Sequence, residues 1–343
     1  MKSLQQNVSL KPFHTFGTFV MARWFGTFSD ADELEELFDR EAASRVVILG
    51  GGSNVLFTRD FDGLVLKNEV SGITELHEDT EFVYVRAGAG ENWHRFVLYC
   101  ISRNWGGLEN LSLIPGNVGA SPMQNIGAYG VEADDVFWDL EAWHIKEKRK
   151  VTFTRSDCEF GYRHSVFKGK FKDQFVILNV TFQLRKKPRL NIMYGAIEQE
   201  LEKMGVQELS VKAVSDAVIR IRRSKLPDPA EIGNAGSFFK NPVISADHFR
   251  ELKDRFGTMV GYETVEGSVK LAAGWLIEQC GPDANTSWKG YLRGDAGCYD
   301  KQALVLVNYG TASGQEILLL SEEIKQSVSN KFGITLEREV NVF

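Results

Sequence analysis

Two glycine-rich runs hold the residues of this chain whose types and spacing suit phosphate binding. The first is Gly50-Gly51-Gly52-Ser53-Asn54, directly after an apolar segment. The second spans residues 114–130 and combines four glycines and two prolines with little charge. Small side chains let main-chain N–H groups face an anion at close range. Two such runs predict a large phosphate-bearing cofactor that is held along its length.

The common nucleotide-binding templates do not match these runs. The third glycine of a GxGxxG fingerprint would fall at Val55, and no Gly-Lys-Ser or Gly-Lys-Thr sequence is present. A Rossmann fold is therefore not favoured. Taken alone, Gly50 to Gly52 fit a plain tight turn between two strands as well as they fit a phosphate-binding turn. Ser53 and Asn54 favour binding, because both side chains can donate hydrogen bonds to the same anion.

Composition limits the classes of protein that remain. The chain has 343 residues, 43% of them hydrophobic and 25% charged, which predicts a globular protein of two or three domains. A net charge of −6 argues against a nucleic-acid partner but leaves room for a basic patch around one anionic ligand. No apolar run reaches membrane length and no signal-peptide core is present, so we expect a cytoplasmic protein without a membrane partner.

The cysteines predict neither a disulfide nor a metal site. No two of them form a CxxC pair, and none has a histidine at metal-ligand spacing. We expect reduced thiols that pack in the interior. They are Cys100, Cys158, Cys280 and Cys298.

Apolar periodicity predicts an α+β protein with many strands in its first half. Helices are expected at residues 29–43, 93–101, 197–204, 211–223, 271–279 and 314–331. Strands are expected at residues 46–49, 64–66, 82–85, 136–145, 151–154, 176–184, 303–307 and 334–343. The sequence Leu226-Pro227-Asp228-Pro229 is a stiff break and a candidate domain boundary.

Several long blocks resemble one family. Gly-Gly-Gly-Ser-Asn-Val-Leu at 50–56 and Ile-Pro-Gly-x-Val-Gly-x-Ser-Pro-x-Gln-Asn-Ile-Gly-Ala-Tyr-Gly at 114–130 are similar to the UDP-N-acetylenolpyruvoylglucosamine reductases. These are the flavoenzymes of the second step of bacterial peptidoglycan precursor synthesis. Further blocks follow in order at 158–167, 225–229, 233–242 and 270–277. The resemblance extends from about residue 10 to the C-terminus.

The resemblance implies an α+β architecture: a vanillyl-alcohol-oxidase-type (PCMH-type) FAD-binding domain of two α+β subdomains, with a C-terminal α+β substrate-binding domain. The implied boundaries are 1–67 and 68–225 for the two FAD subdomains, with the C-terminal strand 333–343 joined to the second, and 226–332 for the substrate domain. This architecture accounts for two glycine-rich turns without a Rossmann fingerprint. The expected FAD contacts are Gly50, Gly51, Gly52, Ser53, Asn54, Pro115, Gly116, Gly119, Ala120, Ser121, Asn125, Gly127, Ala128, Tyr129 and Gly130.

The implied reaction is a hydride relay from NADPH through FAD to UDP-N-acetylglucosamine enolpyruvate, which yields UDP-N-acetylmuramate. The protein must then stabilise charge on the substrate carboxylate and protonate the adjacent carbon. The resemblance assigns the proton donor to Ser237, although a serine beside glycine is more often part of a local turn. Arg163, in Phe-Gly-Tyr-Arg, would bind the carboxylate through its guanidinium fork, whereas most arginines form surface ion pairs.

Glu339 is the third expected catalytic residue. In a strand, Glu337 and Glu339 would share a face with Arg338 pointing away, so spacing alone does not separate them. The family pattern Leu-Glu-x-Glu-Val selects Glu339, with a role in stabilising or relaying the proton of the enolic intermediate. Arg338 departs from the proline that family members often carry there, and a solvated acidic terminus is the alternative.

The remaining assignments concern the substrate. A basic run at 220–225 suits a diphosphate, a carboxylate or the phosphate of NADPH, although such runs usually form a solvated helix face. Tyr194 matches a tyrosine loop of the loop-bearing type I subtype, where it would cover the uridine or sugar; an exposed aromatic residue near a linker explains it equally well. The expected substrate contacts are Tyr162, Tyr194, Arg222, Lys225, Lys240, Asn241 and Lys270.

Two other functions compete with the reductase. An FAD-linked oxidase of an alcohol or sugar would use oxygen and lack a nucleotide-sugar site. A non-catalytic flavin- or nucleotide-sugar-binding module would need no proton donor. Ser237 and the basic run favour the reductase, which we expect to act as a monomer on small molecules.

Overall fold

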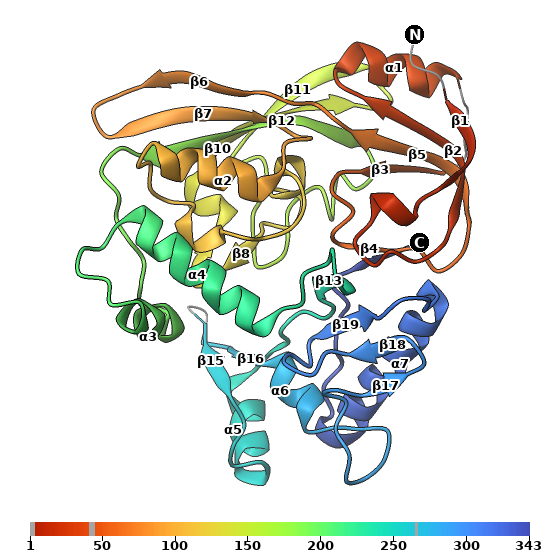
Figure 1. The fold of residues 1–343 in the computed structure, drawn as a ribbon, viewed down its shortest axis with the longest axis vertical. Helices are drawn as coiled ribbons and strands as arrows, with labels where there is room; N and C mark the ends of the chain where they lie inside the picture. The colour runs from red at the N-terminus through yellow and green to blue at the C-terminus, as the bar shows by residue number, and fades with distance from the viewer. Residues whose placement is uncertain (1–3, 41–44, 265–266) are drawn as a thin grey trace. The chain divides into compact units, whose positions relative to one another are not determined.

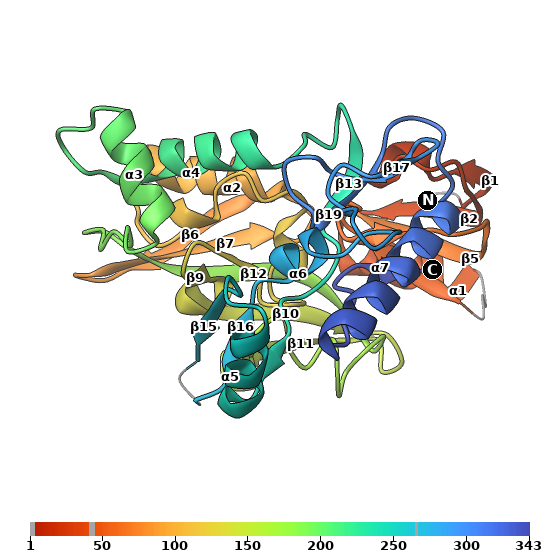
Figure 2. The ribbon, with the colours of Figure 1, turned by 90° about the horizontal axis from the view of Figure 1, so that it is seen from below.

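The structure is a computed structural model that describes residues 4–40, 45–264 and 267–343. The chain divides into two compact units, and each is described by itself (Figures 1 and 2). The first contains the chain up to Val8, Ala22–Gly52 and Asp62–Ser224. The second contains Ser9–Met21, Ser53–Phe61 and Lys225–Phe343.

Two sheets form the frame of the first unit. The smaller sheet has the order β1-β2-β5-β3, from β1 (Gln5–Ser9), β2 (Met21–Phe28), β3 (Val46–Leu49) and β5 (Phe61–Asn68). The larger is antiparallel, with the order β11-β10-β12-β7-β6. Its strands are β6 (Ile73–Glu78), β7 (Phe82–Gly88), β10 (Phe137–His144), β11 (Arg149–Thr154) and β12 (Phe175–Arg185).

Helices bury the apolar faces of these sheets. Helix α1 (Ala31–Arg40) packs Leu34 and Leu37 against the smaller sheet. Helix α2 (Trp93–Ser102) lies along one face of the larger sheet in both views (Figures 1 and 2), with Trp93 and Phe96 against Phe182. Helices α3 (Gly195–Lys203) and α4 (Val211–Lys225) pack on each other through a small apolar cluster.

The second glycine-rich run connects α2 to the larger sheet. It contains the 3-10 helix η3 (Val118–Ala120) and the hairpin of β8 (Gly127–Ala128) and β9 (Val131–Glu132). The other 3-10 helices are η1 (Lys11–Phe13), η2 (Glu109–Leu111) and η4 (Ala133–Val136).

The second unit has its own apolar core around helix α7 (Gly314–Phe332). This helix begins at a capping box formed by Ser313 and Glu316 and lies beside the sheet β13-β19-β18-β17. The strands of that sheet are β13 (Gly233–Ser237), β17 (Leu292–Arg293), β18 (Ala296–Cys298) and β19 (Val305–Asn308). The other elements are β4 (Val55–Leu56), β14 (Val243–Ile244), α5 (Ala246–Arg255), β15 (Gly261–Glu263), β16 (Val269–Leu271), α6 (Ala273–Glu278) and β20 (Asn341–Val342).

Most predicted elements are present within two or three residues of their expected ends, because long apolar periodicities are reliable local signals. The prediction for residues 41–43 lies outside the described residues. One prediction is wrong: residues 334–343 do not form a continuous strand. Among the described residues, only an isolated bridge at Arg338 and the pairing of β20 with β4 occur there. Ile334 and Leu336 alternate in burial as a strand would, but this stretch lacks ladder partners in the described chain.

The four cysteines are free and buried, as predicted. Burial raises the pKa of Cys158 and of Cys298 to about 12. Among the described residues, no helix is long and apolar enough to cross a membrane, and no group of histidine, cysteine or acidic side chains is arranged to hold a metal ion.

Candidate active site

The two glycine-rich runs meet main chain to main chain in the first unit. A Cβ atom added to Gly51 would lie 2.6 Å from Oδ1 of Asn117 and 2.8 Å from Cα of Gly116. A Cβ atom at Gly119 would lie 2.5 Å from that of Ala89. Only glycine permits these approaches, so the glycines in the two runs mark places where main-chain segments lie in close contact.

This junction leaves main-chain donors available. In the described part of the chain, the N–H groups of Gly51, Gly116 and Asn117 donate no hydrogen bond to the protein. Gly52 and Gly116 have φ values of +63° and +110°, which turn successive peptide units in directions that other residues rarely adopt. A concavity of main-chain N–H groups binds phosphate oxygens, so these residues fit the diphosphate of the expected FAD.

Asn117 is a residue that the sequence analysis missed. Its side-chain amide donates to the carbonyl of Gly90, just before α2, and its Cβ lies against Gly50. It thereby ties the second run to the first. The family pattern specifies no residue type at this position, and no local signal separates Asn117 from a solvated loop residue.

The other expected cofactor residues occupy the loop in different ways. Gly127 and Ala128 form β8, while Tyr129 and Gly130 turn the hairpin with φ values of +51° and +77°. Pro115 and Ala120 are exposed. Two side chains are used inside the loop: Ser121 donates to the carbonyl of Val118, and Asn125 bonds three neighbouring segments.

Ser53 and Asn54 belong to the second unit. The Asn54 side chain donates to the carbonyl of Glu339 over 3.2 Å, and its own carbonyl accepts from the N–H of Asn341 over 3.1 Å. Asn54 therefore joins the end of the first glycine run to the C-terminal segment that carries an expected catalytic carboxylate.

Arg163 docks on the second glycine-rich run. Its Nη2 donates to the carbonyl of Gly127 over 2.7 Å and its Nη1 to the carbonyl of Asn125 over 3.4 Å. Arg163 has a φ of +53°, a strained value for a side chain of this size. The exposed ring of Tyr162 lies beside it, with Cζ of Arg163 5.3 Å from the ring centre. The first unit thus brings two expected substrate contacts to the expected cofactor loop.

A second group of expected residues meets around Tyr129, near the C-terminal end of this run. The rings of Tyr129 and Tyr194 pack edge to face with centroids 5.4 Å apart. Arg222, on α4, donates to the carbonyl of Leu113 over 3.2 Å and also to the Tyr129 hydroxyl. Burial lowers the pKa of Arg222, although its bond to Tyr129 opposes the shift. Burial raises the pKa of Tyr129, because it disfavours the charged phenolate.

His94 completes this group. Its Nδ1 accepts a hydrogen bond from the N–H of Leu113 over 3.0 Å, which requires that nitrogen to be unprotonated. Burial, with the nearby charges of Arg222 and Arg223, lowers the pKa of His94. Leu113 itself has a φ of +58°. The sequence analysis did not single out His94.

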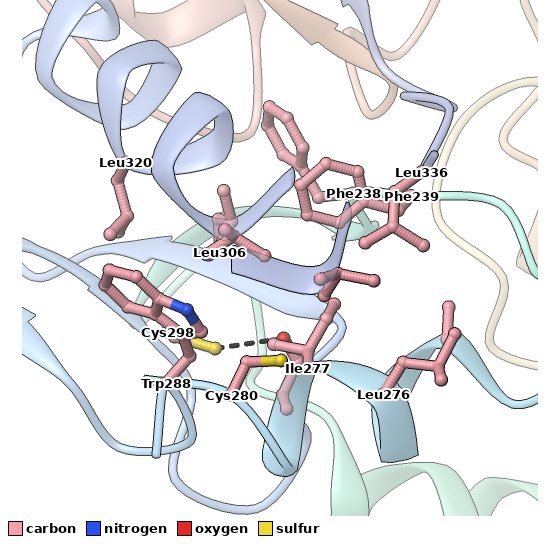
Figure 3. Close-up of a cluster of buried hydrophobic side chains, with 14 of the residues drawn as sticks. Phe238, Phe239, Leu276, Ile277, Cys280, Trp288, Cys298, Leu306, Leu320 and Leu336 are labelled. Atoms are coloured by element: carbon pink, nitrogen blue, oxygen red, sulfur yellow. Dashed lines mark hydrogen bonds between the residues drawn. The ribbon is translucent and has the colours of Figure 1, made fainter. Parts of the chain in front are cut away.

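In the second unit, Ser237 ends β13 at a main-chain irregularity. Gly236 has a φ of +67°, and the ladder with β19 skips between Asn234 and Ser237. Phe238 and Phe239 then insert into the core with Leu306 and Leu336 (Figure 3). Ser237 is half-buried, and its hydroxyl makes no hydrogen bond to the described protein. The aromatic pair anchors the segment, while the serine remains at the edge of the core.

Glu339 lies on the chain segment next to Ser237. Its N–H donates to the carbonyl of Phe238 over 2.9 Å, and Phe239 forms a bridge with Arg338. The neighbouring carboxylate is used differently, because Glu337 pairs with Lys240 over 3.0 Å. Arg338 donates to Ser321 and Glu322 of α7. The three consecutive charged side chains therefore have different environments, which spacing alone did not reveal.

The remaining substrate candidates are held by local structure. Asn241 accepts a hydrogen bond through Oδ1 from the N–H of Ala273, at the start of α6. Lys270 lies in β16, between partners in β14 and β15. Lys240 is engaged with Glu337, and Lys225 is exposed at the end of α4.

Comparison with protein families matches both parts of the chain. A model described as FAD binding domain matches residues 28–144, which include both glycine-rich runs. A model described as the C-terminal domain of UDP-N-acetylenolpyruvoylglucosamine reductase matches residues 228–343, which include Ser237 and Glu339.

Curated relatives match over nearly the full length. The reductase of that name from Flavobacterium johnsoniae is 49% identical over 340 residues, 99% of each chain. The one from Pseudomonas putida is 47% identical over 341 residues, 99% of this chain and 98% of its own. The chain belongs to the UDP-N-acetylenolpyruvoylglucosamine reductase family.

The fold agrees with that membership. The crystal structure of the UDP-N-acetylenolpyruvylglucosamine reductase from Thermus caldophilus superposes with a TM-score of 0.69 at 22% identity, over 100% of both chains. As predicted, this member of the UDP-N-acetylenolpyruvoylglucosamine reductase family is an α+β protein with an FAD-binding domain followed by the C-terminal domain of the family. It is an FAD-dependent oxidoreductase.

Proposed function

We propose that this protein reduces UDP-N-acetylglucosamine enolpyruvate to UDP-N-acetylmuramate with NADPH, in the synthesis of peptidoglycan precursors. Its relatives of 45–49% identity carry the name of this reductase and span almost the whole chain. The observation that carries the proposal is the N–H of Glu339 bonded to the carbonyl next to Ser237. An acid and a hydroxyl on adjacent segments suit proton delivery to a substrate carbon.

The bound FAD would supply hydride transfer between NADPH and the enolpyruvyl group. Ser237 donates a proton to the carbon adjacent to the substrate carboxylate, and its half-buried hydroxyl has no competing protein partner among the described residues. A serine is a weak acid, but a carbon with enolate character is a strong base, so the proton transfer is favourable. Glu339 stabilises or relays that proton.

Arg163 binds the substrate carboxylate and stabilises its negative charge as the adjacent carbon becomes carbanionic. Its guanidinium donates to the main-chain carbonyls of Asn125 and Gly127, which hold it against the second glycine-rich run. Tyr162 adds a contact beside it.

The remaining assignments extend the same proposal. FAD is held by main-chain groups of the two glycine-rich runs, with the N–H groups of Gly51, Gly116 and Asn117 at its diphosphate. Tyr194, Arg222, Lys225, Lys240, Asn241 and Lys270 bind the UDP-sugar. The domain division at residues 67 and 225, the type I subtype, the cytoplasmic location and the monomeric state stay predictions.

One experiment tests the function. The purified protein is examined by visible spectroscopy, and NADPH oxidation is followed with and without UDP-N-acetylglucosamine enolpyruvate. We expect a yellow protein whose NADPH oxidation depends on that substrate. A colourless protein that does not take up added FAD would contradict any flavoenzyme, and substrate-independent consumption of NADPH and oxygen would instead support an oxidase.

A further inference from the structure

The Asn125 side chain links three segments of the first unit. It is 1% exposed. Its Nδ2 donates to Oε2 of Glu132 in β9 over 2.6 Å and to the carbonyl of Gly161 over 3.3 Å. Its Oδ1 accepts from the N–H of Asp134, in η4, over 3.0 Å. Both amide hydrogens and the carbonyl oxygen are therefore used inside the protein.

The hydrogen bond from Asn125 to the carbonyl of Gly161 bears on the proposed chemistry, because Gly161 begins the turn that carries Arg163. Gly161 and His164 exchange two main-chain hydrogen bonds of 3.1 Å, which closes a two-residue turn. The residues at the tip of that turn are Tyr162 and Arg163. Arg163 has a φ of +53°, a conformation that a non-glycine residue keeps only when its surroundings enforce it.

The same asparagine also supports the far end of the Arg163 side chain. The guanidinium donates to the main-chain carbonyls of Asn125 and Gly127. Asn125 has a φ of +45°, a left-handed conformation that asparagine adopts more readily than most residues. Its side-chain bonds hold that conformation and so fix the direction of the carbonyl that receives Arg163.

We propose that Asn125 is a positioning residue that holds the turn carrying Tyr162 and Arg163 and sets the orientation of the Arg163 guanidinium. Its side chain then serves the substrate step of the reaction rather than flavin binding. The inference rests on the proposed function, because it takes Arg163 to bind the substrate carboxylate. Its structural part can be measured without substrate or flavin.

The first test is amide hydrogen exchange on the flavin-free protein. Asn125→Asp keeps the size and the acceptor of the side chain but removes both donors and places a carboxylate opposite Glu132. We expect exchange in residues 158–166 to accelerate at least about tenfold, because local opening becomes easier. Unchanged exchange in this segment would overturn the proposal.

Asn68→Asp is the matched control. Asn68 is also buried in the first unit, donates to the carbonyl of Ile177 over 2.9 Å and accepts from the N–H of Val70 over 3.1 Å. Asn68→Asp loses one buried donated hydrogen bond and Asn125→Asp loses two, so a general loss of stability affects both variants. Only Asn125→Asp is expected to accelerate exchange at 158–166.

The second test separates the two half-reactions by rapid mixing. In Asn125→Asp we expect flavin reduction by NADPH to stay within about twofold of the unmodified protein. Flavin reoxidation by the enolpyruvyl substrate should slow about 10- to 100-fold, the usual effect of misplacing a reacting group by about 1 Å. An equal loss in both half-reactions would show a general defect and overturn the positioning role.

A double-mutant cycle identifies the residue through which Asn125 acts. Once Arg163→Ala has removed the guanidinium, adding Asn125→Asp should slow the substrate step by no more than about twofold further, because coupled residues are not additive. Multiplicative effects would overturn the proposal. If Arg163→Ala alone left the substrate step unchanged, the role assigned to Arg163 would be wrong. The hydrogen-exchange experiment would still test whether Asn125 holds the turn.

Discussion

Ser237 shows how a common residue type acquires an unusual position. Gly236 takes a left-handed conformation at the end of β13, and the next two side chains enter the core of the second unit. The serine is thereby fixed at a core boundary with a hydroxyl that no described residue binds. A serine in a local turn normally uses its hydroxyl on a nearby main-chain group. The lack of such a bond at Ser237 favours its role as a proton donor over a role in a local turn.

We expect Ser237→Ala to separate the two half-reactions. Loss of a general acid typically slows the dependent step about 10²- to 10⁴-fold, whereas hydride transfer to the flavin does not use this proton. Stopped-flow absorbance should show normal flavin reduction by NADPH and collapsed reoxidation by substrate. Equal loss of both steps would remove Ser237 from the role of proton donor. Thermal unfolding of the variant serves as the control for folding.

His94 provides a pH-dependent prediction. Its pKa is lowered in the folded protein by burial and by the nearby Arg222 and Arg223, whereas the unfolded chain titrates near 6.5. Below pH 6.5 the unfolded chain therefore binds more protons than the folded protein, and folding stability falls as the pH decreases. The contribution of neutral His94 to folding stability is complete above pH 6.5 and is lost as the pH falls toward the pKa of His94 in the folded protein.

The measurement is urea unfolding at pH 7.5, 6.5 and 5.5. His94→Asn keeps an acceptor near the position of Nδ1 for the N–H of Leu113 but does not titrate. We expect the variant to lose less stability than the unmodified protein between pH 7.5 and 5.5. The buried His14, whose pKa burial also lowers, should leave a remaining slope in both proteins. Identical slopes would contradict the role of His94.

At the scale of elements, the cofactor loop depends on contacts between segments that are distant in sequence. The turn after β3 meets the start of η3, and the hairpin β8/β9 receives the Arg163 turn. Helix α2 contributes through the carbonyl before its N-terminus, which accepts from Asn117. Each of these contacts is a main-chain approach or a side-chain bond to main chain, so they fix backbone positions in a loop whose Val118 also packs in the apolar core.

Gly51→Ala tests this arrangement. The added methyl group would lie 2.8 Å from Cα of Gly116, which is backbone and unable to move alone. We expect the purified variant to retain less than about one tenth of the normal flavin, because close packing at main chain costs about 1–3 kcal/mol. The ratio of flavin to protein absorbance measures the loss.

Gly257→Ala is the matched control for this prediction. A Cβ atom at Gly257 meets nothing within 4 Å, so the same chemical change brings no contact. This control should keep its flavin. If Gly51→Ala also kept a full complement of flavin, the two runs would not form the cofactor cradle in the way inferred above.

At the scale of the whole molecule, the expected catalytic residues are divided between the units. Arg163 lies in the first unit with most of the glycine-rich runs, whereas Ser237 and Glu339 lie in the second. Each unit has a buried core of its own. Each set of expected residues is therefore supported by the core of its own unit. A bound cofactor adds stability to the folded chain.

Added FAD should stabilise the flavin-free protein in a concentration-dependent way. Above the dissociation constant, each tenfold rise in free FAD adds about 1.4 kcal/mol to the free energy of unfolding. Thermal unfolding across an FAD series should show the midpoint rising steadily. Riboflavin, which lacks the diphosphate, should shift the midpoint far less, because we propose that the N–H groups of Gly51, Gly116 and Asn117 bind the phosphate oxygens. Equal shifts for both ligands would contradict the diphosphate site.

Much of this molecule could be predicted from the sequence by itself. Helices such as α2, α4 and α7 follow from apolar residues at helical spacing. The residue types of the glycine-rich runs predicted a phosphate-bearing cofactor. The family blocks then singled out Arg163, Ser237 and Glu339. These signals are local: a periodicity or a motif is complete within its own segment.

Only the tertiary structure decided what those segments meet. Ile334 and Leu336 alternate like a strand, yet strands need hydrogen-bond partners that the segment itself does not contain. Spacing could not separate Glu337 from Glu339, but contact with Lys240 occupies the first, while Asn54 binds the main chain of the second. Asn117 carries no local signature, and the motif around Asn125 does not reveal what its side chain contacts, because those carbonyls and the carboxylate are brought to it by folding.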